Sequence, residues 1–117
     1  MTYNNIVKIQ KEVCDRYGSP YIESQPLLMV GISLNVRSGL LPINGLRHPL
    51  EGKTSGWYIW AGDKLLDDPN FFVPIHFKHL IDWCPNVLPY ICLAPGWRFL
   101  IAGEYVDVWE DKSLINI

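Results

Sequence analysis

The chain has 117 residues, a length that favours one compact domain spanning residues 1–117. Apolar residues make up 49% of it and charged residues 19%, which excludes an intrinsically disordered chain. The net charge of −2 gives no indication of nucleic-acid binding. No apolar stretch approaches the roughly 20 residues of a membrane span, and the N-terminus lacks a signal-peptide pattern. We therefore expect a cytoplasmic protein with neither a membrane nor a nucleic acid as its partner.

Charged residues are unevenly distributed along the chain. Residues 1–58 carry six Lys or Arg and four Asp or Glu, whereas residues 59–117 carry four and eight. Four of these eight acidic residues lie between Glu104 and Asp111. The pattern predicts an acidic surface near the C-terminus, which favours a basic partner.

The first predicted element is an amphipathic helix near the N-terminus. Its apolar residues recur at spacings of three and four, which is the period of one helix face. They are Ile6, Ile9, Val13 and Tyr17. Asn4 or Asn5 is expected to cap the start of this helix, and Gly18 followed by Pro20 is expected to end it.

A strand and a loop are predicted next. Strict alternation of apolar residues from Leu28 to Val36 is the period-two pattern of a strand. Residues 42–56 contain Gly45, Gly52 and Gly56 and few large apolar side chains. This composition predicts a long surface loop, with a short strand inside it as the alternative.

The middle of the chain predicts a buried strand and a second helix. The apolar run WYIWA at 57–61 follows a glycine and is typical of a central strand covered on both faces. The residues DDPN at 67–70 mark a turn, after which Pro74 suits the first position of a helix. The apolar face of that helix is expected to comprise Phe77, Leu80, Ile81 and Cys84. Pro85 ends the helix, and one further helical turn is expected at 86–92.

Two last strands complete the predicted fold, WRFLI at 97–101 and YVDVW at 105–109. In the second, Val106 and Val108 are expected to face the core, and Tyr105, Asp107 and Trp109 the opposite side. The order of elements predicts an α+β fold, with a mainly antiparallel sheet packed against an N-terminal helix and a second central helix. The segments GWYIWAG and GWRFLIAG resemble each other, which we interpret as shared strand entry and exit rather than duplication.

Catalytic and metal-binding chemistry has few candidates. His76 and His79 are three residues apart, near Asp82 and Cys84, a spacing at which side chains can share a metal. Ring packing is the simpler interpretation, so no metal and no cofactor are expected. Cys84 could pair with His48 or His76, but no basic or glycine-rich setting lowers the pKa of any cysteine. All three cysteines are expected to be reduced and buried. A small enzyme or ligand-binding domain using Cys84 or the histidines is the alternative function.

The stretch from residue 54 to 111 carries a series of aromatic and Pro/Gly blocks. They read TSGWYIWAGD, DDPNFFVPIH, WCPNVLPY, PGWRFLIA and YVDVWED, and NGLRHPLEG precedes them at 44–52. These ordered blocks resemble the immunity protein 33 family of bacterial polymorphic toxin systems, over roughly residues 27–111. The resemblance implies a small cytoplasmic protein, not an enzyme, that neutralises a toxin made by the same or a neighbouring cell. Its mechanism would be binding, usually over the active site of the toxin.

Two candidate surfaces could bind such a toxin, since Trp, Tyr and Arg are enriched at interface centres and polar groups at the rim. The first is the non-core side of the last strand with its flanking acids, namely Glu104, Tyr105, Asp107, Trp109, Glu110 and Asp111. The second is the 42–56 loop, with Arg47, His48, Glu51 and Lys53. The alternatives are that Trp109 packs against the first helix and that the loop covers a sheet edge. A monomer or weak homodimer is expected, and a domain that serves only to oligomerise is a third alternative.

Overall fold

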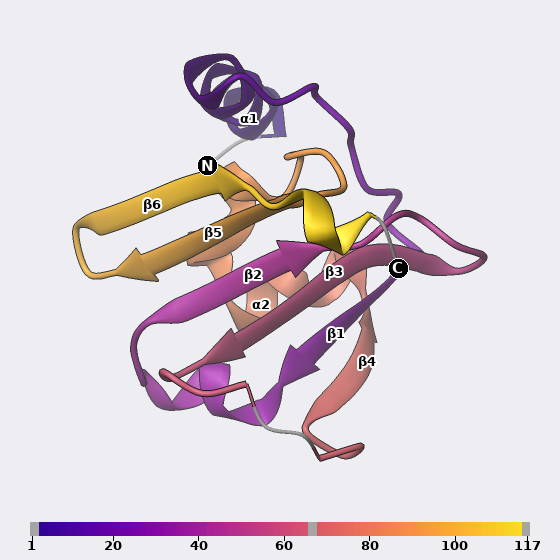
Figure 1. Cartoon of the computed structure of the whole chain (residues 1–117), viewed down its shortest axis with the longest axis vertical. Helices are drawn as coiled ribbons and strands as arrows, with labels where there is room; N and C mark the ends of the chain where they lie inside the picture. The colour runs from indigo at the N-terminus through magenta and orange to yellow at the C-terminus, as the bar shows by residue number, and fades with distance from the viewer. Residues whose placement is uncertain (1–2, 66–67, 116–117) are drawn as a thin grey trace.

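The computed structural model describes residues 3–65 and 68–115 (Figure 1). Its helices and strands are α1 (Tyr3–Tyr17), β1 (Met29–Ser33), β2 (Ile43–Arg47), β3 (Thr54–Ala61), β4 (Phe72–His76), α2 (Leu80–Trp83), β5 (Trp97–Ala102) and β6 (Tyr105–Glu110). The described strands form a six-stranded sheet in the order β4-β1-β3-β2-β5-β6. Within it β1 and β3 are parallel, and the other neighbouring pairs are antiparallel. The predicted α+β fold with a mainly antiparallel sheet is confirmed.

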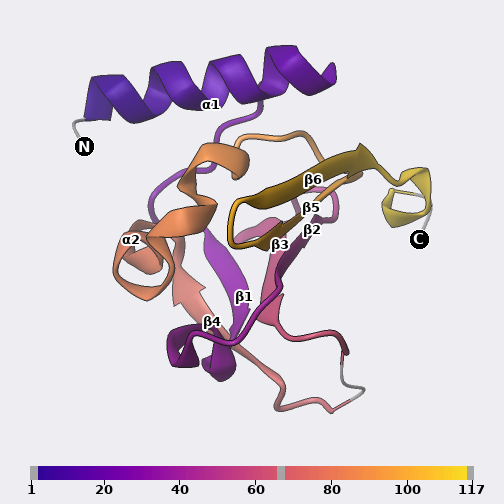
Figure 2. The same cartoon turned by 90° about the vertical axis from the view of Figure 1, so that its left-hand side faces the viewer.

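The two faces of the sheet have different coverings. Both helices lie on the same side (Figure 2), where Val13 of α1 and Leu80 of α2 join the main core with Trp57, Ile59 and Phe99. We call this side the helix face, and the opposite side the open face. A smaller cluster of Leu46, Trp60 and Leu114 is buried on the open face. Alternation along each strand sends one set of side chains to each face.

Helix α1 confirms the predicted helix. Its first described residue is Tyr3, so Asn4 and Asn5 lie within the described helix and not before it. At the other end, Gly18 has a φ of +84° and its N–H donates to the Cys14 carbonyl at 2.9 Å. A left-handed glycine of this kind commonly ends a helix, which explains the predicted stop.

Strand β1 is shorter than the alternation from Leu28 to Val36 predicted. It ends at Ser33, and a 3₁₀ helix follows over Leu34–Ser38. Asn35 accounts for this end: its side-chain amide donates to the Ala61 carbonyl at 3.0 Å and accepts from the Ala61 N–H at 3.2 Å. The Asn35 side chain thereby replaces a backbone partner of β3. Leu34 is left 63% exposed.

The prediction of a surface loop over 42–56 is wrong, and so is the idea that it covers a sheet edge; the alternative, a short strand inside this stretch, is confirmed. This stretch holds β2, an interior strand between β3 and β5, and the first residues of β3. Gly45 is needed because the Phe99 ring lies over it: an added Cβ would be 2.2 Å from Phe99 Cε2. The glycine therefore marks a close approach of a ring to the backbone, not a turn.

Pro74 does not start a helix. It lies in β4, an edge strand, where the missing N–H of proline is tolerated. The helical segment begins with a 3₁₀ turn at Phe77–His79 and continues as α2.

The remaining helical predictions hold except at one side chain. Helix α2 ends at Trp83 with Cys84 as its C-cap, directly before Pro85, and the predicted further turn is a 3₁₀ helix over Pro85–Tyr90. Cys84 is buried as expected, but Ile81 from the predicted apolar face is 56% exposed.

Strands β3 and β5 flank β2 and have the same local geometry at a glycine, which is the third residue of β3 and directly precedes β5. Gly56 has a φ of +89° and Gly96 a φ of +93°, and each precedes a buried tryptophan, Trp57 or Trp97. This shared geometry supports our interpretation of the two similar segments. The strand order, with β3 between β1 and β2, confirms that the WYIWA run is a central strand.

Candidate partner-binding face

Strand β6 presents its two sets of side chains as the sequence predicted. Val108 is buried in the main core and Val106 packs against it, so both point to the helix face. Because side chains alternate along a strand, Tyr105, Asp107 and Trp109 lie on the open face. The strand is at the end of the sheet, next to β5.

Trp109 and Arg98 form the centre of this part of the open face. They are opposite each other in the β5–β6 register, and the Arg98 guanidinium lies 5.6 Å from the centroid of the indole. Arg98 Nη1 is also 3.2 Å from Asp111 Oδ2. In the described part of the chain, the buried Arg98 Nε has no hydrogen-bond partner. Leu100, half-buried, is the next β5 residue on the same face.

Trp109 does not pack against α1, which was the alternative drawn from the sequence. The α1 residues Val13 and Cys14 belong to the core on the helix face, whereas Trp109 is opposite Arg98 on the open face. The indole is half-buried, so part of it is accessible to a partner.

Four acidic residues near the hairpin have two different environments. Glu104, Asp107 and Glu110 are exposed, and none of them forms an ion pair with another described residue. Asp111 instead accepts hydrogen bonds from the N–H and the hydroxyl of Ser113 and pairs with Arg98. These contacts, those of Ser113 foremost, hold the pKa of Asp111 below its usual value. The uncompensated negative charge therefore belongs to the other three residues.

Arg47 is not a surface residue, so its predicted role in partner binding is wrong. Its side chain is 0% exposed. Nε donates to the Ser55 carbonyl at 2.9 Å, Nη1 to those of Ile22 at 2.7 Å and Leu93 at 2.8 Å, and Nη2 to Ser24 Oγ at 3.1 Å. Burial lowers the pKa of Arg47 to about 10, so the guanidinium is still protonated at neutral pH. It holds together distant parts of the chain.

The other residues of the second predicted surface are near the end of β2. His48 is half-buried, with Nδ1 3.0 Å from the Leu114 carbonyl oxygen and its ring edge-on to Tyr58. Because Leu114 follows β6 closely, this contact brings His48 to the C-terminal end of β6. Glu51 and Lys53 are exposed in the turn between β2 and β3.

The sequence pattern did not single out Arg98 and Leu100, although the signal was present. Alternate residues of WRFLIA share one face, and the turn at 103–104 fixes which residues of the two strands are opposite. Counting back from that turn places Arg98 beside Trp109.

The alternative chemistry of Cys84 and the histidines finds little support in the geometry. Burial raises the pKa of the Cys14 and Cys84 thiols, and raises that of Cys92 to about 11. Thiols of this kind are poor nucleophiles at neutral pH. His76 and His79 are exposed, with ring centroids 6.1 Å apart. Across residues 3–65 and 68–115, no three His, Cys, Asp or Glu side chains are grouped to hold a metal ion.

Alkylation provides a direct test of the thiol environment. We expect iodoacetamide at pH 8 to label Cys92 at least about 100-fold more slowly in the folded protein than in urea, because two pKa units remove that much thiolate. The labelling rate should continue to rise with pH towards 11 instead of levelling near 9. Mass spectrometry counts the labelled cysteines, and the urea-unfolded chain is the control. Rapid labelling of Cys84 in the folded protein would restore it as a nucleophile.

A mixed six-stranded sheet with both helices on one face defines a small α+β protein. The family model of the Imm33-like domain matches residues 9–111, and the chain belongs to this family. The resemblance seen in the ordered sequence blocks is thereby confirmed. Among curated proteins and solved structures, none matched the chain. Within the described residues, no helix has the length and apolar character needed to cross a membrane.

Proposed function

We propose that this chain is an immunity protein that neutralises a bacterial toxin by binding it, without chemistry of its own. Membership of the Imm33-like family supports the immunity role. The single observation that supports a binding mechanism is the open face of the β5–β6 hairpin, where a partly exposed indole lies among free carboxylates. The toxin would belong to a polymorphic toxin system and would be met in the cytoplasm by a monomer or weak homodimer.

The proposed contact surface has an aromatic centre and an acidic rim. Trp109 and Tyr105 form the centre, and Tyr105 is 61% exposed. Arg98 lies against the Trp109 ring, so the ring loses little freedom when a partner covers it. The rim comprises Glu104, Asp107, Glu110 and Asp111, with His48 near the end of β6 and Glu51 in the turn between β2 and β3. Aromatic residues in such a setting are frequent hot spots of protein interfaces.

Charge on this surface indicates a basic partner. Glu104, Asp107 and Glu110 are exposed acids, and Arg98 on this face is already paired with Asp111. Asp107 on the open face, with Glu104 and Glu110 at the two ends of β6, attracts a positively charged protein and accelerates its association. A toxin whose active site is lined with Lys or Arg therefore fits the surface.

The function is tested by expressing the proteins encoded beside this chain and measuring bacterial growth. We expect one neighbour to be toxic when expressed alone, and co-expression of this chain to restore growth. The two proteins should also form a complex when both are purified. The proposal fails when no neighbour is toxic, or when the toxic one neither binds this chain nor is relieved by it.

Substitutions on β6 test the proposed surface. We expect Trp109→Ala to weaken toxin binding by about 30-fold or more, the loss typical of an aromatic hot spot. Asp107→Lys should slow association by about tenfold at low salt and by less at high salt. Surface plasmon resonance separates these association and dissociation rates. Asp82→Lys, an exposed acid on α2, is the matched control. Equal affinity of the Asp107 and Asp82 variants would place the contact surface elsewhere.

A further inference from the structure

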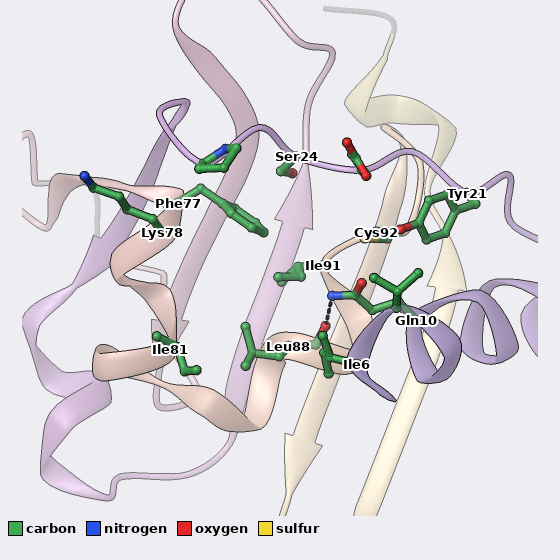
Figure 3. A pocket seen from close by; sticks show the side chains of 13 residues that line it. Ile6, Gln10, Tyr21, Ser24, Phe77, Lys78, Ile81, Leu88, Ile91 and Cys92 are labelled. Carbon is green, nitrogen blue, oxygen red and sulfur yellow. Dashed lines mark hydrogen bonds between the residues drawn. The ribbon is translucent and has the colours of Figure 1, made fainter. Parts of the chain in front are cut away.

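A pocket of about 400 Å³ lies between α1 and the α2 region. Figure 3 shows Ile6 and Gln10 of α1 on one side of it and Phe77, Lys78 and Ile81 on the other. The residues that line the pocket come from the helix side of the fold, so it is separate from the open face. Its volume is within the range of sites that bind small molecules.

Apolar side chains, aliphatic and aromatic, form most of the pocket wall. Val7 on α1 is half-buried, and Leu88 and Ile91 lie between the two sides. Ile81 also lines the pocket while remaining 56% exposed. A ligand with an aliphatic body would cover this side chain and gain the free energy of removing apolar surface from water.

Ser24 provides a polar group in this apolar wall. It lines the pocket, is 7% exposed, and its Oγ accepts the hydrogen bond from Arg47 Nη2. The hydroxyl hydrogen of Ser24 is then left to donate, and the described residues offer no acceptor with which it forms a hydrogen bond. An oxygen of a ligand in the pocket would be such an acceptor.

The guanidinium behind Ser24 gives this wall a positive potential. Arg47 is fully buried, and its hydrogen-bond acceptors are backbone carbonyls and Ser24, with no carboxylate among those described. A buried cation without a counterion acts strongly over a few ångströms, because little water screens it. The two charged side chains of the lining, Lys78 and Glu23, are opposite in sign and exposed, so solvent screens both.

We propose that this pocket binds a small amphipathic carboxylate. The aliphatic chain of the ligand lies against Val7, Ile81 and Leu88, and its carboxylate accepts the Ser24 hydroxyl hydrogen near the Arg47 guanidinium. The exposed Lys78 contributes a weak, solvent-screened attraction, and the exposed Glu23 an opposing one. This function is independent of toxin binding, because it uses the other side of the sheet. A failed toxin experiment therefore leaves it unaffected.

Titration of the purified chain with sodium octanoate tests the proposal. We expect saturable binding of one octanoate per chain in amide NMR spectra, with the largest shifts in α1 and in residues 77–92. Octan-1-ol and octylamine, which have the same chain length, should bind at least about tenfold more weakly. Shifts that do not saturate, or octylamine binding as tightly as octanoate, would overturn the proposal.

Two variants locate the site without disturbing the fold. Val7→Phe adds a ring to the hollow, and Lys78→Gln removes an exposed charge, so both proteins should fold normally. We expect Val7→Phe to reduce octanoate affinity by more than about tenfold and Lys78→Gln by about threefold. Lys112→Gln, an exposed lysine beyond β6, is the control. Octanoate affinity unchanged in both Val7→Phe and Lys78→Gln would show that the pocket is not the site.

Discussion

Replacing Arg47 by alanine is expected to reduce the free energy of unfolding by about 4 kcal/mol or more. The substitution removes the donor of four hydrogen bonds and leaves the buried carbonyls of Ile22, Ser55 and Leu93 without that partner. It also leaves a cavity where a fully buried side chain was. A domain of this size is stable by only about 5–15 kcal/mol, so the variant should be largely unfolded at modest urea concentrations. Tryptophan fluorescence during urea unfolding measures the change.

Two further substitutions separate the charge of Arg47 from its hydrogen bonds. Arg47→Lys keeps the cation but cannot reproduce the planar set of donors, so its stability should lie between those of the wild type and Arg47→Ala. Arg16→Ala removes an exposed arginine from α1 and should change the free energy of unfolding by less than about 0.5 kcal/mol. If Arg47→Ala were destabilised no more than Arg16→Ala, the role of Arg47 as the link between these segments would be refuted.

Gly56→Ala is the second substitution with a large expected effect. Gly56 has a φ of +89°, and an added Cβ would lie 1.9 Å from the His48 carbonyl oxygen, which is a backbone atom. The backbone of β2 or β3 must therefore move, and we expect a loss of about 3 kcal/mol or more. Thermal unfolding followed by circular dichroism measures it.

Gly103 provides a matched control for Gly56. Its φ is also positive, +64°, but nothing lies within 4 Å of an added Cβ. Gly103→Ala should therefore cost only the conformational strain of about 1 kcal/mol. Similar losses for the two variants would show that conformation, and not the contact with His48, is what requires glycine at position 56.

Arg47 lies in β2, and Gly56 of β3 contacts His48, the residue that follows β2. The two largest expected effects therefore concern the strand that composition alone did not reveal. Helix α1 and the strands β3, β5 and β6 were predictable because their apolar periods are visible in the sequence. In β2, Gly45 and Arg47 are present because of partners far along the chain, the Phe99 ring and the Leu93 carbonyl. No local pattern carries that information.

The candidate site was predictable to a similar extent. Period-two alternation correctly assigned Trp109 and Asp107 to the side away from the core. The internal pairing of Asp111 with Arg98 depends on the strand register and on the turn after β6, which a search for charged residues does not include. Arg47 was assigned to the surface because residues 42–56 were predicted to form a surface loop. Arginine is seldom fully buried, and four hydrogen bonds make this case an exception.

The hairpin of β5 and β6 also affects how such a protein can diverge. Phe99 and Val108 maintain the core, while Arg98, Asp107 and Trp109, one position away along the same strands, do not. Mutations of Arg98, Asp107 or Trp109 can alter recognition at little cost in stability. Mutations of Phe99 or Val108 instead destabilise the fold and leave the recognition surface unchanged. Descendants of one ancestral chain can therefore acquire new partners by drift at alternate positions while retaining the same scaffold.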